Sequence, residues 1–134
     1  IEITMTDIQI KRVYDDPHGD DGYRVFVDLL WPRGESHTNF KYDSWPNNLA
    51  PSAQLREWFH LDPDSRWAEF RKKYLDELCH TPAAISFARK IASKPKVTLL
   101  YASRDTEHNN AAVFRDFLMT QEANTTSAAV YSLN

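Results

Sequence analysis

The sequence predicts a small α/β domain, a layered sandwich in which a mainly parallel sheet of three to four strands is flanked by helices. Two strand-like segments lie near the N-terminus, three amphipathic helical segments follow, and a buried strand and a helix come last. The chain has 134 residues, the usual size of one domain. We assign residues 1–120 to that domain and residues 121–134 to a C-terminal tail.

The first strand is predicted over Asp7–Tyr14, where Arg12 shares a face with two isoleucines. Asp15–Gly22 combines Pro, Gly and Asp, which is typical of a turn. A second strand is predicted from Tyr23 to about Leu30. Because it has apolar side chains on both faces, we expect it to be a central strand that is covered on both sides.

Pro32 ends the second strand, because proline cannot donate to a strand ladder. Glu35–Pro51 follows without clear periodicity. Loops of this length are uncommon in compact domains and are often functional or partly helical.

Three helices are predicted next. The first spans Ser52–His60 with Ser52 as N-cap, and the second spans Asp64–His80 with Asp64 or Ser65 as cap. The third spans Thr81–Ser93, with a proline at its first helical position. Such a long helical excursion between two strands is typical of a parallel crossover.

Lys96–Ser103 is the clearest buried strand of the sequence. The last helix is predicted from about Thr106 to Thr120, with Asp105 as its N-cap. In the tail, Ala129–Leu133 could add an edge strand.

Composition narrows the class of protein. A net charge of −3 disfavours nonspecific nucleic-acid binding. The single cysteine, Cys79, forms no internal disulfide and is expected to be a buried thiol in a reducing compartment. We expect neither a signal peptide nor a membrane span, and therefore a cytoplasmic protein. The histidines lack ligand spacing, so no metal site is predicted, and no cofactor is identified.

Charged and aromatic side chains follow the predicted strand ends. Since ligands bind beyond the carboxyl ends of open parallel sheets, we expect these side chains to meet at one edge. The arginines would bind a phosphate or carboxylate, Trp31 would form a wall, and His108 or Asp105 would transfer protons. The candidate ligand-binding residues are Arg12, Asp28, Trp31, Arg33, Arg104 and Asn109, and the candidate catalytic residues are His108 and Asp105.

Each candidate also has a structural interpretation. Asp28 could form a buried ion pair with Arg33 or Arg104, and Trp31 could belong to the core. Asp105 could serve as a helix cap. Arg12 could fix its strand to a neighbour, and His108 could be a structural or exposed residue.

Several segments together resemble the YeaO-like family, the domain of unknown function catalogued as 488. They are Ile10–Asp15 (IKRVYD), Trp31–Gly34 (WPRG) and Thr98–Asp105 (TLLYASRD) with His108-Asn109 behind it. The resemblance covers about residues 8–118 and implies a cytoplasmic bacterial α/β protein without an agreed reaction. It also implies that the family's motif falls on the candidate site residues. One departure is Leu29, where the family usually carries Arg.

Three functions remain open, and whether the protein is an enzyme is one of the questions. The best supported is binding of, or action on, a small anionic ligand at the Arg/Asp/His/Trp cluster. The alternative is a protein-interaction or regulatory module that uses the loop Glu35–Pro51 with its aromatics Phe40, Tyr42 and Trp45. Nucleic-acid binding is the least favoured, and the sequence does not predict an oligomeric state.

Overall fold

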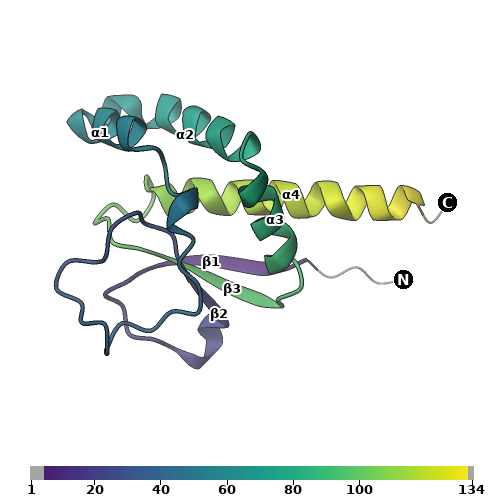
Figure 1. Ribbon diagram of the computed structural model, residues 1–134, viewed down its shortest axis with the longest axis horizontal. Coiled ribbons are helices and arrows are strands. Elements are labelled where there is room, and N and C mark those ends of the chain that lie inside the picture. Colours follow the sequence, from purple (N-terminus) through teal and green to yellow (C-terminus); the bar gives the residue numbers. More distant parts are fainter. Residues whose placement is uncertain (1–4, 133–134) are drawn as a thin grey trace.

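The computed structural model describes the backbone of residues 5–132 and side chains up to Asn124. Within that range the strands and helices run in the order strand, strand, three helices, strand, helix (Figure 1). This order confirms the predicted small α/β fold. The elements are β1 (Asp7–Arg12), β2 (Tyr23–Phe26), α1 (Ala53–Leu61), α2 (Pro63–Cys79), α3 (Pro82–Ile91), β3 (Lys96–Tyr101) and α4 (Asn110–Ser132), with 3-10 turns η1 (Gly19–Asp21) and η2 (Asn47–Leu49).

The three strands pair in the order β1-β3-β2, and both pairings are parallel. The prediction that the second strand is central was wrong, because β3 occupies the middle. β2 lies at the border of the sheet, where an isolated bridge joins Val25 to Ser44. Val25 and Phe26 are nevertheless fully buried, since a loop takes the place of a neighbouring strand.

The two faces of the sheet are covered differently. The helices lie on one face (Figure 1), where they pack against Val25, Val97 and Leu99. On the other face, Phe26 and Leu100 pack against Phe40 from the loop after β2. One layer is therefore helical, and the opposite layer is built from loops.

Two of the first three helices begin where the sequence predicted. Ser52 caps α1, and its Oγ accepts a hydrogen bond of 3.3 Å from the backbone N–H of Leu55. Pro82 opens α3 as predicted. The N-cap of α2 is Asp62 rather than Asp64 or Ser65, because Pro63 already lies in the first turn.

The last helix differs most from its prediction. It begins at Asn110 and continues to Ser132, so residues 129–132 are helical and not an edge strand; Leu133 lies outside the described residues. No Gly or Pro interrupts the sequence from Asn110 to Ser132, so nothing in it ends the helix. In the described part of the chain, neither α4 nor any other helix is long and apolar enough to cross a membrane.

Candidate functional site

A cavity of about 440 Å³ lies where the carboxyl ends of the strands meet. Because all three strands run the same way, the segments that follow β2 and β3 reach the same edge of the sheet. The cavity is lined by residues 28–33 after β2, by residues 102–104 after β3, and by the start of α4. Residues of α1 and the segment before it, Tyr14 after β1 and Phe70 of α2 complete the lining.

Six of the eight predicted site residues line this cavity, namely Asp28, Trp31, Arg33, Arg104, His108 and Asn109. Arg12 does not. Its Nε donates to the carbonyl of Ser103 at 2.9 Å, and its Nη2 donates to the carbonyl of Ala102 at 3.0 Å. Arg12 therefore ties the end of β1 to the segment after β3, as in its structural interpretation.

Asp105 is also absent from the lining. The prediction that it caps the last helix was wrong. Its Oδ1 accepts hydrogen bonds from the backbone N–H groups of His108 and Glu107, at 2.9 and 3.0 Å. These bonds stabilise the carboxylate and lower the pKa of Asp105. The cap of α4 is Asn109, whose Oδ1 accepts from the N–H of Ala112 at 2.8 Å.

Asp28 lies half-buried between β2, β3 and α4. Its Oδ2 accepts from the N–H of Ala102, and its Oδ1 from Nδ2 of Asn110, both at 2.9 Å. Burial raises the pKa of Asp28 although these two hydrogen bonds act in the opposite direction. Among the described residues, Asp28 forms no ion pair with Arg33 or Arg104.

Three arginines line the cavity from three separate segments. Arg33 follows β2, Arg104 follows β3, and Arg56 comes from α1. The exposed side chains of Arg33 and Arg104 make no hydrogen bond or ion pair with any described residue. The charge of Arg56 acts to lower the pKa of Asp28, but the larger effect of burial keeps that pKa raised.

Arg56 and His60 also line the cavity, although the sequence pattern did not predict them as site residues. They are four residues apart, so they share one face of α1. This spacing was the available signal, but the sequence did not indicate that α1 crosses the strand ends.

Trp31 belongs both to the cavity wall and to an aromatic cluster. Its ring stacks on His37 with centroids 4.0 Å apart and meets Phe40 edge-on at 5.4 Å. Its Nε1 donates to the carbonyl of Glu35 at 2.8 Å. Packing on several sides holds the indole in one position.

His108 is held by a ring contact of its own. Its imidazole stacks on Trp67 of α2 with centroids 4.7 Å apart. In the part of the chain that the structure describes, no group of three or more His, Cys, Asp or Glu side chains is arranged to hold a metal ion.

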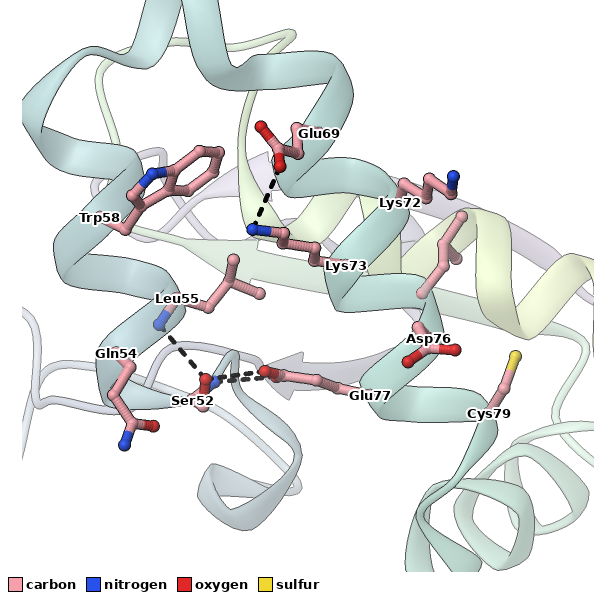
Figure 2. A pocket seen from close by; sticks show the side chains of 11 residues that line it. Ser52, Gln54, Leu55, Trp58, Glu69, Lys72, Lys73, Asp76, Glu77 and Cys79 are labelled. Carbon is pink, nitrogen blue, oxygen red and sulfur yellow. Dashed lines mark hydrogen bonds and ion pairs between the residues drawn. The ribbon is translucent and has the colours of Figure 1, made fainter.

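A second hollow, of about 820 Å³, lies between α1 and α2 (Figure 2). Several of its polar side chains pair with one another: Lys73 contacts Glu69 at 3.2 Å, and Glu77 accepts from the hydroxyl of Ser52 at 2.7 Å. Cys79 lies on its rim and is exposed, so the expectation of a buried thiol was wrong.

The comparisons with known proteins identify the family. The family model described as "Inactive DUF488-N3 subclade" matches residues 7–132. The chain belongs to this subclade. The resemblance to YeaO-like proteins is thereby confirmed.

Two relatives are similar to this chain over most of their length. The uncharacterized protein YeaO of Escherichia coli is 42% identical over 111 residues, which are 83% of this chain and 96% of YeaO. The uncharacterized protein Rv3073c of Mycobacterium tuberculosis is 39% identical over 116 residues, 87% of this chain and 97% of that protein. No solved structure matches the chain at a significant level.

Proposed function

We propose that this protein binds a small organic anion in the strand-end cavity and does not turn it over. The observation that carries the proposal is the convergence of Arg33, Arg56 and Arg104 on one cavity, two of them without a partner among the described residues. Guanidinium groups offer planar paired donors that suit carboxylate and phosphate oxygens.

Binding without turnover is supported by the groups that proton transfer would need. The lowered pKa of Asp105 and its place outside the lining make it a poor proton donor near neutral pH. His108 lines the cavity, but its ring forms no ion pair with a carboxylate among the described residues. The description of the matching subclade as inactive points the same way.

The protein-interaction alternative has less support. It requires exposed aromatic side chains on the loop after β2, but Phe40 is buried and packs against Phe26. Trp45 is half-buried, and its Nε1 donates to the carbonyl of Asp28 at 2.7 Å. Tyr42 is the exposed aromatic of the three.

The test is an NMR titration of the ¹⁵N-labelled protein with sodium phosphate and with benzoate at constant ionic strength. We expect amide shifts over residues 28–33, 50–60 and 102–110. Arg104→Gln should weaken the response by about tenfold, because one charge-assisted contact is lost. Arg89→Gln is the matched control, since Arg89 is an exposed arginine of α3 outside the cavity. Equal effects of the two variants would refute the proposal.

A further inference from the structure

The charge of the strand-end cavity indicates the charge of its ligand. Three arginines, Arg33, Arg56 and Arg104, line the cavity together with one acidic residue, Asp28. The formal charges of these four side chains, three positive and one negative, leave two positive charges to be balanced. A phosphomonoester carries nearly two negative charges at neutral pH and presents three acceptor oxygens, whereas a carboxylate carries one charge.

The size and lining of the cavity indicate that the ligand is larger than an inorganic ion. A volume of about 440 Å³ lies within the range of sites for small organic molecules. Leu29, Pro51, Phe59 and Phe70 contribute apolar surface to the lining. An organic body beside the anion would cover that surface.

Asp28 and Asn110 present hydrogen-bond acceptors at the cavity, which indicates that the organic part of the ligand carries hydrogen-bond donors. Asn110 directs its Nδ2 to the carbonyl of Val27 and to Asp28, which leaves its Oδ1 without a donor among the described residues. Each carboxylate oxygen of Asp28 accepts one hydrogen bond and can accept another. N–H or O–H groups of a ligand would satisfy these acceptors.

We propose that the ligand is a phosphomonoester with a donor-bearing organic part, of the size of a nucleoside monophosphate. The arginines hold the phosphate, and Asp28 with Asn110 accepts hydrogen bonds from the organic part. This inference rests on the proposed function and assigns the chemical class of its anion.

The test is isothermal titration calorimetry with the four nucleoside 5′-monophosphates, ribose 5-phosphate, adenosine and inorganic phosphate, at one ionic strength. We expect at least one monophosphate to bind about tenfold or more tightly than both adenosine and inorganic phosphate, because each of these carries half of the recognised groups. Arg104→Gln and Arg33→Gln should each weaken that binding by about tenfold, and Arg89→Gln should leave it unchanged. Thermal melts confirm that the variants are folded.

The outcomes separate the two proposals. If benzoate or phosphate shifts the cavity amides but no phosphomonoester binds more tightly than inorganic phosphate, the ligand class is wrong and the anion site stands. If phosphomonoesters bind equally well to the Arg104→Gln and Arg89→Gln variants, both proposals are wrong. If none of the tested anions binds, both proposals are wrong.

Discussion

Asp28 accepts a hydrogen bond of 2.9 Å from the side-chain amide of Asn110, which links the segment after β2 to the first turn of α4. The same carboxylate accepts from the N–H of Ala102 after β3. One side chain therefore fixes three walls of the cavity. Because it is a buried acid, this connection depends on pH.

We expect Asp28→Asn to change how stability depends on pH. Burial raises the folded-state pKa of Asp28 above its ordinary value of 3.8. The stabilisation from its protonated form is fully present below the unfolded pKa and is lost as pH rises through the folded pKa. Wild-type protein should therefore lose stability relative to Asp28→Asn above about pH 4, by about 1.4 kcal/mol for each pH unit that separates the two pKa values.

Urea unfolding of both proteins from pH 3 to 7 measures this difference. The other acids titrate in both proteins and cancel. Asp20→Asn, at an exposed position of η1, is the control and should give a nearly flat difference. A wild-type advantage that grows with pH would contradict the expected sign.

Asp21 should show the opposite pH dependence. Its buried carboxylate contacts Arg24, lies 3.2 Å from Nζ of Lys11 and accepts from the N–H of His18 at 3.0 Å. Burial acts to raise its pKa, but the His18 hydrogen bond and the two cations outweigh burial and lower it. Its stabilisation is thus present above the unfolded pKa and is lost as pH falls through the folded pKa.

Asp21→Asn should cost about 3 kcal/mol of unfolding free energy at pH 7, because it leaves the buried Arg24 cation without its counter-charge. Chemical denaturation checks the value. The loss should shrink as the pH falls below the unfolded pKa of about 3.8, and it should be smallest below the lowered folded pKa, where the wild-type carboxylate is also neutral. A loss of the same size as that of Asp20→Asn would show that the buried pair contributes nothing.

The sequence predicted the elements of the fold better than their arrangement. Hydrophobic periodicity, the N-cap Ser52 and the proline at the start of α3 depend on neighbours in the chain, so they could be recognised locally. The position of β3 between β1 and β2 depends on pairing between distant segments. Burial of Val25 and Phe26 was predicted correctly. The same apolar sequence pattern results whether a loop or another strand covers β2, so the pattern could not show that β2 lies at the border of the sheet.

The candidate site was predictable where it follows strand ends. Parallel strands bring their ends together, which placed Arg33 and Arg104 on one cavity. Arg12 also ends a strand, but its guanidinium donates to backbone carbonyls instead of lining the cavity. The sequence alone does not show which way this side chain points. Arg56 reaches the cavity from a helix whose docking position no local pattern determines.

Asn109 was predicted as a ligand-binding residue, and its hydrogen bonds indicate a test of its structural role. Its Oδ1 caps α4, and its Nδ2 donates to the carbonyl of Asp105 at 2.9 Å. Asn109→Ala should cost about 1–2 kcal/mol of unfolding free energy, the usual loss for a helix cap. Asn109→Ser keeps a side-chain oxygen that can accept from the N–H of Ala112 and adds no buried charge, so it should cost less than Asn109→Ala.

Thermal and urea unfolding of the two Asn109 variants provide the measurement. Equal losses would contradict capping, since the two variants differ in the acceptor that serves Ala112.

Gly19 and Gly22, at the two ends of η1, allow a matched comparison of glycine substitutions in the connection between β1 and β2. Gly22 has a φ of +65°, and a Cβ added there would lie 2.4 Å from the carbonyl oxygen of Lys96. Gly19 has no heavy atom within 4 Å of such a Cβ. Gly22→Ala should cost about 2 kcal/mol or more, from backbone strain and from displacement of the start of β3. Gly19→Ala should be neutral or stabilise by up to about 1 kcal/mol.

Urea unfolding of the two glycine variants gives their free energies, and hydrogen exchange locates the damage. In Gly22→Ala the amides of Tyr23–Phe26 should exchange faster, because β2 pairs with β3 from Tyr23 and Val97 onward. Protection of α3, which lies elsewhere in the chain, should change less. Equal free energies of unfolding for the two alanine variants would contradict the prediction that the close approach of Gly22 to Lys96 requires glycine.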